Sequence, residues 1–261
     1  MGDRRVCLVT GAARRVGRAI ALELAAGGFD VAVHYRQSST EADATVAELR
    51  RLGAQAASFQ ADLSDEAACR SLLTAVVTRL GRVDAVVNNA STFEADDAHS
   101  FGHAAMERHW RANTAPAILL AQQLHVHLAA RGGSGCVVNL LDQKLWNPNP
   151  DYFSYTLSKA ALQAATVMLA QALAPVLRVC GVAPGVTLPQ NEMSAQEFAL
   201  AARKTPLLRS STPHDVACAV RYLLDAPAVT GTTLLVDGGQ HLQAQPRDVL
   251  FLVQAEQAGH P

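Results

Sequence analysis

The sequence lacks long apolar runs, and only 17% of its 261 residues are charged. No uninterrupted apolar stretch approaches the roughly 20 residues that a helix needs to cross a bilayer, so we expect no membrane span and no membrane partner. The formal net charge is −1, and the basic residues form no long run. Nucleic acid is not an expected partner either, because binding to phosphate polymers needs a positive field.

Paired cysteines and a targeting signal are also missing. The amino terminus runs directly into a short apolar strand, without the apolar core and cleavage site of a secretory signal, so we expect a cytoplasmic location. An odd number of scattered cysteines argues against a disulfide framework and against a zinc site, and we expect reduced, mostly buried thiols and no metal. The five cysteines are Cys7, Cys69, Cys136, Cys180 and Cys218.

A regular alternation of short β-rich runs with longer helical patterns fills most of the chain. Seven strands are predicted, at residues 6–10, 31–35, 55–60, 85–88, 135–140, 177–182 and 232–236. Helical periodicity covers residues 16–26, 41–52, 66–80, 101–129, 154–174 and 213–224. This alternation predicts an α/β fold with a doubly wound, mostly parallel seven-stranded sheet and helices on both faces.

Neither a repeat nor a low-complexity linker divides the chain, so we expect a single domain over residues 1–261. Residues 188–211 interrupt the alternation and form either a cover for a substrate or an ordinary surface loop with one helix. Residues 249–253 near the carboxyl terminus are too apolar to be comfortably solvated. This tail is expected at a subunit interface or over a neighbour's site, or else as a frayed end.

The first predicted strand leads into a glycine-containing turn, residues 10–17, and then into a helix. Gly11 permits a tight turn, Gly17 lets the helix approach the sheet, and free amides at the helix start favour a pyrophosphate. Arg15 stands where a middle glycine is usual, so its side chain should point into the site. The order of strand, turn and helix predicts a dinucleotide-binding site of the Rossmann type.

The end of the second predicted strand indicates which dinucleotide binds. It carries no Asp or Glu to hold a free ribose 2′-hydroxyl. Arg14, Arg36 and Ser38 can instead surround a 2′-phosphate, which favours NADPH; the alternative is that these arginines are solvated surface charges. Asp62 and Leu63, after the third strand, suit an adenine contact, although Asp62 can equally cap a turn.

Tyr155 and Lys159 are four residues apart on a predicted helix and therefore share one face. Hydride transfer to a polar double bond leaves negative charge that must receive a proton. An ordinary tyrosine, with a pKa of about 10, titrates too far from neutrality, and a neighbouring ammonium is expected to lower that pKa. The two residues are predicted to form a proton-transfer pair; the alternative is a surface lysine beside a half-buried tyrosine.

Several of these motifs occur together in an order that resembles the short-chain dehydrogenase/reductase family, from residue 6 to about residue 242. Besides the glycine turn and the Tyr-Lys pair, they are Asn88-Asn89-Ala90, Asn113 and Pro184-Gly185. The resemblance implies that Lys159 also holds the nicotinamide ribose and that Asn113 supports a water chain. It further implies a homotetramer or homodimer built on the helices at 101–129 and 154–174.

Position 142 departs from the family pattern. Members usually have a serine thirteen residues before the tyrosine, whereas this chain has Asp142. An ionised aspartate cannot donate a hydrogen bond and repels a developing oxyanion, which disfavours simple ketone reduction. With Arg15 in the turn and Ser91-Thr92-Phe93 after Asn-Asn-Ala, this replacement is similar to the pteridine reductases, which reduce dihydropterins and folates.

A pterin suits these positions. Phe93 can stack on the bicyclic ring, and Ser91 and Arg15 can bind its polar edge. Asp142 can accept from the ring nitrogens or, when protonated, donate to them. Each residue also has a structural interpretation: Phe93 as core, Ser91 as a turn residue, and Asp142 as a carboxylate paired with an arginine.

These observations leave three hypotheses: an NADPH-dependent pteridine reductase, a reductase of another carbonyl or imine compound, and a nonenzymatic NADP-binding regulatory protein. The intact Tyr-Lys pair counts against the third. The predicted catalytic residues are Asn113, Asp142, Tyr155 and Lys159. The predicted substrate contacts are Arg15, Ser91, Phe93, Asp142 and Tyr155. The predicted cofactor contacts are Gly11, Arg14, Arg15, Val16, Gly17, Tyr35, Arg36, Ser38, Asp62, Leu63, Asn89, Ala90, Tyr155, Lys159, Pro184 and Gly185.

Overall fold

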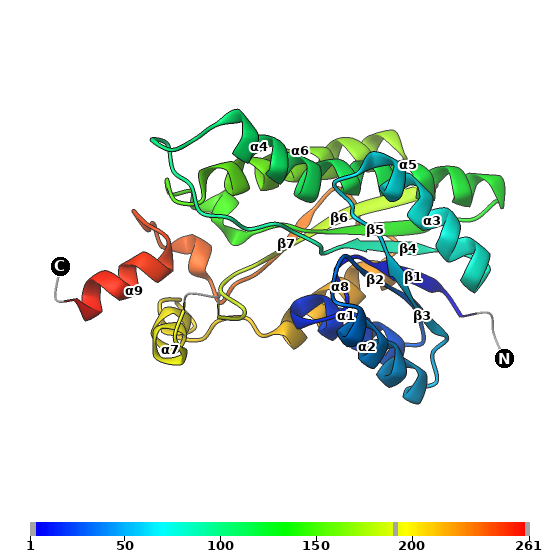
Figure 1. Cartoon of the computed structure of the whole chain (residues 1–261), viewed down its shortest axis with the longest axis horizontal. Helices are drawn as coiled ribbons and strands as arrows, with labels where there is room; N and C mark the ends of the chain where they lie inside the picture. Colours follow the sequence, from blue (N-terminus) through cyan, green and yellow to red (C-terminus); the bar gives the residue numbers. More distant parts are fainter. Residues whose placement is uncertain (1–3, 190–192, 259–261) are drawn as a thin grey trace.

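The computed structural model describes residues 4–189 and 193–258 and confirms the alternation of strands and helices (Figure 1). The strands are β1 (Val6–Val9), β2 (Asp30–Tyr35), β3 (Ala56–Gln60), β4 (Ala85–Asn88), β5 (Gly135–Leu140), β6 (Leu177–Pro184) and β7 (Thr233–Val236). The helices are α1 (Arg15–Ala26), α2 (Ser39–Arg51), α3 (Glu66–Leu80), α4 (His103–His109), α5 (Ala115–Ala130), α6 (Phe153–Ala172), α7 (Ala195–Arg203), α8 (Pro213–Asp225) and α9 (Val249–Gln257).

All seven strands form one parallel sheet in the order β3-β2-β1-β4-β5-β6-β7. From β1 to β3 each new strand is added on one side of β1, and from β4 to β7 each new strand is added on the other side. Loops after β1 and β4 therefore leave the sheet toward opposite faces and open a crevice between them, which is where doubly wound sheets bind ligands. The predicted fold class is confirmed.

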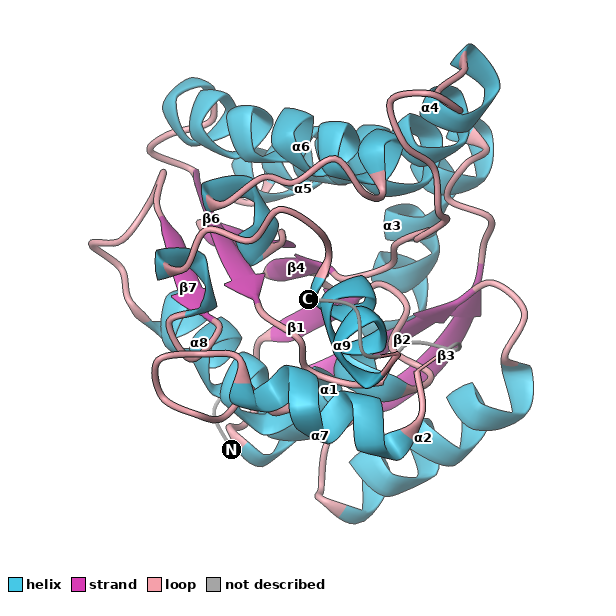
Figure 2. Ribbon diagram, turned by 90° about the vertical axis from the view of Figure 1, so that its left-hand side faces the viewer, coloured by secondary structure: helices cyan, strands magenta, loops and turns pink. Residues whose placement is uncertain are grey.

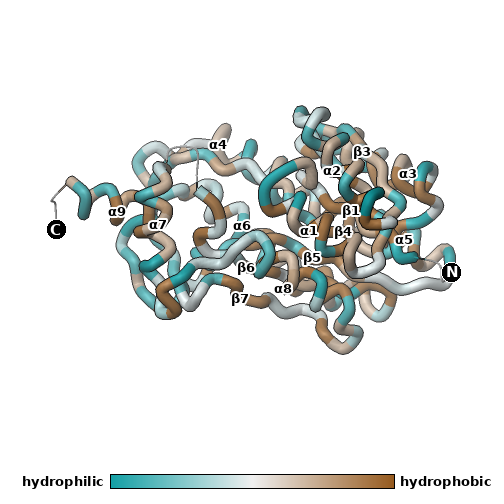
Figure 3. The backbone as a smooth tube through the Cα atoms, turned by 90° about the horizontal axis from the view of Figure 1, so that it is seen from below, coloured by the Kyte–Doolittle hydropathy of each residue, from teal (hydrophilic) through white to brown (hydrophobic). Residues whose placement is uncertain are grey.

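Two helical layers cover the sheet, with α1, α2 and α8 on one face and α3, α5 and α6 on the other (Figure 2). Strand β1 shows why its sequence is continuously apolar. Cys7 and Val9 pack into the first layer while Val6 and Leu8 pack into the second, because successive side chains of a strand point to opposite faces. The hydropathy colouring in Figure 3 shows the same distribution, with apolar segments along the strands and hydrophilic ones on outer turns.

The helix predicted over residues 101–129 is wrong as a single α-helix. It is divided into α4, a π-helical stretch Trp110–Thr114, and α5. Pro116 lies at the start of α5 and has no backbone N–H, so it cannot donate to the carbonyl of residue 112 and continue the α-helical pattern from the preceding turn. The wider turn holds Asn113, and π-bulges are often found at functional sites.

The apolar tail is an ordered helix rather than a frayed end. Val249, Leu250 and Val253 of α9 pack with Met193 and with Ala201 of α7 in one buried cluster. Residues 190–192 of the predicted insertion 188–211 lie outside the described residues, and the rest contains α7. Whether this segment covers a substrate, and whether α9 contacts a neighbour, remain predictions. Within the described residues no helix is long and apolar enough to span a membrane.

Candidate active site

The turn between β1 and α1 is tightly packed around its two glycines. Gly11 has φ +62°, in the left-handed region that favours glycine. A Cβ on Gly17 would lie 2.2 Å from the Gly11 carbonyl oxygen and 2.5 Å from Nδ2 of Asn89. Asn89 itself donates from Nδ2 to the carbonyl of Thr10 at 2.9 Å. The turn thus closely approaches the loop after β4 and has no room for a side chain at position 17.

His34 joins the ends of three neighbouring strands. The Gly11 amide donates to Nδ1 of His34 at 3.0 Å, and Nε2 lies 3.1 Å from the Ala61 carbonyl. Because an amide can only donate, Nδ1 accepts and the proton of the neutral ring is on Nε2. Burial lowers the pKa of His34 and keeps the ring neutral. The imidazole therefore fixes the glycine turn against the loop that follows β3.

A groove of about 420 Å³ opens at the carboxyl ends of β1, β2, β3 and β4. Its lining includes these predicted cofactor residues: Gly11, Arg14, Arg15, Val16, Gly17, Tyr35, Arg36, Ser38, Asp62, Leu63, Asn89 and Ala90. The sequence did not single out Ala61, Ser64 and Ala112, which also line it. No acidic residue caps the first turn of α1, so its amides are left for an anion.

Arg15 occupies the position where a dinucleotide-binding turn usually has its middle glycine. It keeps the left-handed backbone of a glycine, with φ +54°, and its side chain lies in the groove lining. The guanidinium donates to the carbonyl of Pro189 at 2.9 Å. Arg15 therefore connects the glycine turn to the start of the insertion, and its contact with a substrate remains a prediction.

Four predicted cofactor residues do not line the groove: Tyr155, Lys159, Pro184 and Gly185. Tyr155 and Lys159 are buried on α6 beside it, with exposed fractions of 7% and 3%. Pro184 ends β6, and the Gly185 amide donates to the Val236 carbonyl at 3.0 Å. The structure therefore places the last two at the carboxyl edge of the sheet but beyond β5, outside the groove.

The buried centre of the site brings Tyr155 and Asp142 into contact. The Tyr155 hydroxyl donates to Oδ2 of Asp142 at 2.9 Å, and Oδ1 accepts from the Lys144 amide at 2.9 Å. Lys159 Nζ donates to the Leu140 carbonyl at 2.7 Å and lies 5.7 Å from the centroid of the Tyr155 ring. A phenol, a carboxylate and an ammonium from two separate segments therefore converge.

The pKa values of this centre differ from the expectation for the Tyr-Lys pair. Burial, followed by the negative charge of Asp142, raises the pKa of Tyr155, so the expected lowering by Lys159 is wrong in the free protein. Burial also raises the pKa of Asp142. Burial lowers the pKa of Lys159 to about 8, while Asp142 acts in the opposite direction. A tyrosine that stays protonated is suited to donate a proton.

The pH dependence of catalysis is expected to follow the charge of the Lys159 amine. Below about pH 8 its amine is charged, and the charge is lost as the pH rises through that value. If the charge supports catalysis, kcat/KM should fall above about pH 8, because this parameter reports the free enzyme's groups. Steady-state rates across that range, with NADPH binding measured in the same buffers, check this. A flat profile would contradict the role of the charge.

Asn113 holds the loop that follows β4. Its Oδ1 accepts from the Thr92 amide at 2.7 Å and from the Ser91 hydroxyl at 3.2 Å. Its Nδ2 donates to the Thr92 carbonyl and to the Ser158 hydroxyl, both at 3.0 Å. These bonds connect the π-helical stretch, the loop and α6. The structure thus shows a positioning contact, and the water chain predicted for Asn113 remains a prediction.

Phe93 lies beside Tyr155 with 40% of its surface exposed, so it is not a core residue. Its ring stacks on Tyr152 at 4.2 Å between centroids and meets the Tyr155 ring edge-on at 4.6 Å. Tyr152 in turn faces Phe251 of α9 at 6.1 Å. The sequence indicated Phe93 and Tyr155 but did not connect Tyr152 with Phe251, because these two residues are about a hundred residues apart.

Lys144 was also missed. It is 4% exposed, its Nζ donates to the Asp151 carbonyl at 2.5 Å, and it lies 3.6 Å from Oδ2 of Asp248. Asp142 therefore lies near a buried lysine that is tied to the start of α9. No arginine pairs with Asp142 in the described ion pairs, so the structural alternative of an arginine partner finds no support among the described residues.

Comparison with known proteins agrees with the class of enzyme that this arrangement indicates. Residues 11–241 match the family model described as enoyl-(acyl carrier protein) reductase. The chain belongs to the short-chain dehydrogenase/reductase family of oxidoreductases, as its motifs predicted.

Its relatives carry names for different substrates. The structure of FolM alternative dihydrofolate reductase 1 from Brucella suis, in complex with NADP, is 39% identical, covers 94% of this chain and 98% of that one, and has a TM-score of 0.88. Pteridine reductase 1 from Leishmania tarentolae is 33% identical and covers 91% of this chain and 96% of its own. A protein described as ketoacyl reductase 2 of the granaticin polyketide synthase, from Streptomyces violaceoruber, is 36% identical and covers 91% of this chain and 96% of its own.

Proposed function

We propose that this protein is an NADPH-dependent reductase of dihydropterins or dihydrofolate, with Tyr155 as the proton donor. The observation that carries the proposal is the partly buried Asp142 carboxylate, hydrogen-bonded to the Tyr155 hydroxyl, in the position of the family's serine. A site for a ketone would offer a second donor to the carbonyl oxygen at this position, whereas Asp142 accepts.

The charged side chains and the backbone of the groove both suit NADPH. The end of β2 offers Arg36 and Ser38, and Arg14 faces the same groove, so a 2′-phosphate would find guanidinium partners there. Asp62, after β3, is the acidic residue of the lining, and its pKa is lowered chiefly by hydrogen bonds from Ser64. The missing side chains of Gly11 and Gly17 let the turn pack against the loop after β4. The free amides at the first turn of α1 would then favour the pyrophosphate.

Side chains of the protein hold, orient and donate the proton. When bound, the reduced nicotinamide supplies a hydride. Tyr155 stays protonated in its buried position and donates its proton toward the reduced nitrogen of the substrate. Asp142 orients the hydroxyl through Oδ2 and offers a carboxylate to an N–H of the ring, while Lys159 supplies the positive charge nearby. Phe93, exposed next to Tyr155, offers a stacking surface for a flat ring.

Arg36 is expected to decide between the two nicotinamide cofactors. Substituting Arg36→Ala should weaken NADPH binding by about 10- to 100-fold, because one charge-assisted hydrogen bond contributes roughly 1.5–3 kcal/mol. Binding of NADH, which has no 2′-phosphate, should change little. Fluorescence titration with both cofactors measures the ratio, and Arg79→Ala, an exposed arginine of α3 outside the groove, is the matched control. Equal losses for NADPH and NADH would contradict this role.

The proposal includes a single domain over residues 1–261 that assembles as a homotetramer or homodimer through α5 and α6. Its support is a group of exposed apolar side chains on these helices: Val126, Leu157, Val167 and Met168. Large exposed apolar patches often mark interfaces. Light scattering coupled to gel filtration should show a multiple of the monomer mass and a lower mass for Met168→Glu. The control Leu52→Glu, at an exposed apolar residue after α2, should not change it. A monomeric wild-type protein would refute the assembly.

The direct test of the proposed activity is NADPH oxidation against a panel. Dihydrobiopterin, dihydromonapterin and dihydrofolate should be consumed with NADPH, and small ketones and a ketoacyl thioester should be consumed at least tenfold less efficiently. The ketoacyl arm is included because one relative is named for that reaction. Turnover of ketones with no pterin turnover would favour a carbonyl reductase. Tight NADPH binding without oxidation of any substrate would favour the nonenzymatic hypothesis.

A further inference from the structure

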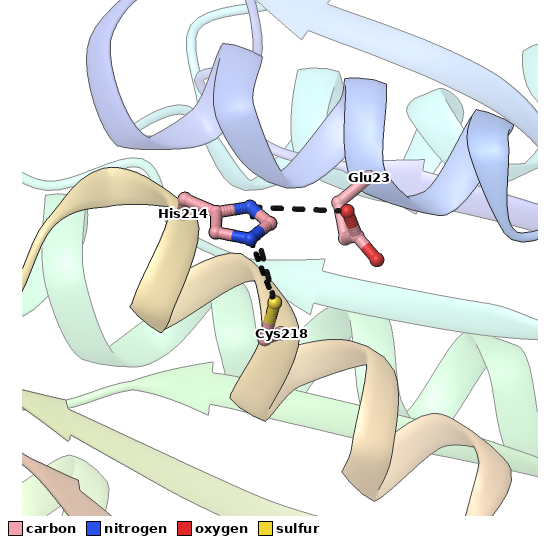
Figure 4. A group of neighbouring side chains, drawn as sticks. All are labelled: Glu23, His214 and Cys218. Atoms are coloured by element: carbon pink, nitrogen blue, oxygen red, sulfur yellow. Dashed lines mark hydrogen bonds and ion pairs between the residues drawn. The ribbon is translucent and has the colours of Figure 1, made fainter.

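A second group of chemically active side chains lies between α1 and α8, away from the buried Tyr155 centre. His214 and Cys218 are four residues apart on α8 and face the same way, and Glu23 points toward them from α1 (Figure 4). Cys218 Sγ lies 3.5 Å from Nε2 of His214, and a Glu23 carboxylate oxygen lies 4.0 Å from Nδ1 of the same ring. One ligand atom from each residue falls within 4.8 Å of the other two.

These three donors match the preferences of zinc. Thiolate, imidazole and carboxylate are its common protein ligands, at about 2.0–2.3 Å from the ion, whereas magnesium and calcium prefer oxygen alone. Two ligands at those lengths around a tetrahedral ion are separated by roughly 3.5 Å, close to the 3.5 Å between Sγ of Cys218 and Nε2 of His214. The carboxylate faces Nδ1, the other nitrogen of the same ring, so the imidazole and the carboxylate must both rotate before the three ligands reach one ion.

The carboxylate is held in place by a neighbour. Arg221 donates from Nη1 to Oε1 of Glu23 at 3.0 Å, and its guanidinium lies against Gly27, where a Cβ would come within 2.6 Å. The other oxygen, Oε2, is the one that faces His214. Hydrogen-bonded partners of this kind orient metal-binding carboxylates. Arg221 adds a positive charge, which the negative charges of Glu23 and Asp215 near Cys218 offset.

The group is open to solvent. Cys218 is exposed, whereas the other four cysteines are buried, and His214 has 74% of its side chain exposed. Beside Glu23 and His214 is a shallow hollow whose lining includes Leu22, Ala26 and Leu52. An ion here would keep at least one coordination position for water. Glu23 is eight residues beyond Arg15, so the ion would lie about 12 Å along α1 from the glycine turn.

We propose that Glu23, His214 and Cys218 form a surface Zn²⁺ site with three protein ligands, which joins α1 to α8. The cysteine spacings gave the opposite expectation, because this site has a single cysteine and takes its third ligand from a distant helix.

Cobalt(II) is the probe that reports the ligands directly. Titrating the purified full-length protein with CoCl₂ should produce a thiolate-to-cobalt charge-transfer absorption that saturates at one ion per chain and is displaced by ZnCl₂. Cys218→Ser should abolish that absorption, and His214→Ala and Glu23→Gln should weaken Zn²⁺ binding by roughly tenfold or more. His99→Ala, an exposed histidine elsewhere, should leave both unchanged. A charge-transfer band that survives in Cys218→Ser would overturn the assignment, as would the absence of saturable binding in the wild type.

Thiol reactivity gives a second readout that does not depend on the dinucleotide site. Cys218 is the exposed cysteine among the described residues, so a thiol reagent should modify one cysteine per chain rapidly. ZnCl₂ should slow that reaction at least tenfold in the wild type but not in His214→Ala. These surface variants should keep the circular dichroism of the wild type. Equal protection by zinc in both proteins would overturn the proposal.

Discussion

Replacing Tyr155 with phenylalanine is expected to reduce turnover of a dihydropterin by about 10²- to 10⁴-fold, the usual contribution of a positioned general acid. The hydroxyl is the atom that the structure places against Asp142, and the ring that contacts Phe93 is retained in the variant. NADPH should still bind, because the groove proposed to hold it is lined by other residues. Single-turnover NADPH oxidation and a parallel binding titration separate the two effects.

The control for this variant is Tyr222→Phe, since Tyr222 is an exposed tyrosine on α8. It should behave as the wild type in both assays. If Tyr155→Phe keeps more than about a tenth of the wild-type turnover, Tyr155 is not the general acid. If turnover and NADPH binding are lost together, the hydroxyl supports the fold of the site rather than proton transfer.

Substituting Asp142→Ser is expected to change the substrate preference. Dihydropterin reduction should fall by about 10²- to 10³-fold, while ketones, whose developing oxyanion gains a donor, should be reduced faster than by the wild type. A second readout is spectroscopic. The Asp142 charge is one cause of the raised pKa of Tyr155, so ultraviolet titration should detect ionisation of Tyr155 at lower pH in the variant.

These two readouts distinguish a chemical role from a structural one. A carboxylate that only supported the fold would, when removed, lower activity on every substrate and leave no gain for ketones. Asp142→Asn keeps the shape of the side chain and removes its charge, so it should lower the pKa of Tyr155 as Asp142→Ser does. An unchanged ratio of pterin to ketone turnover in Asp142→Ser would refute the assignment of substrate preference to this position.

The fold was predictable because its signals are local. Continuously apolar strands such as β1, separated by amphipathic helices, leave a parallel sheet covered on both faces as the arrangement that buries them. The glycine turn was predictable for a similar reason, since the left-handed backbone of Gly11 and the contact of Gly17 with the Gly11 carbonyl lie within the turn itself. The contacts of both glycines with the loop after β4 were not visible in the sequence. Most predicted cofactor residues accordingly lie in one groove.

What could not be predicted depends on contacts between distant segments. The role of His34 requires the ends of three strands at once. Asp142 lies near Lys144, which in turn pairs with Asp248 at the start of α9. Burial of Tyr155, together with the charge of Asp142, raises the pKa of Tyr155 where the sequence predicted a lower one. A neighbouring ammonium is visible in a sequence, but the degree of desolvation is not.

The most direct test of the account is a crystal structure with NADP⁺ and a dihydropterin or a close analogue bound. The account predicts a ring nitrogen within about 3 Å of the Asp142 carboxylate or the Tyr155 hydroxyl, with the flat ring against Phe93 and the dinucleotide along the Arg14 and Arg36 side of the groove. A pterin bound elsewhere, with both Asp142 and Tyr155 beyond hydrogen-bonding reach of its ring, would contradict it.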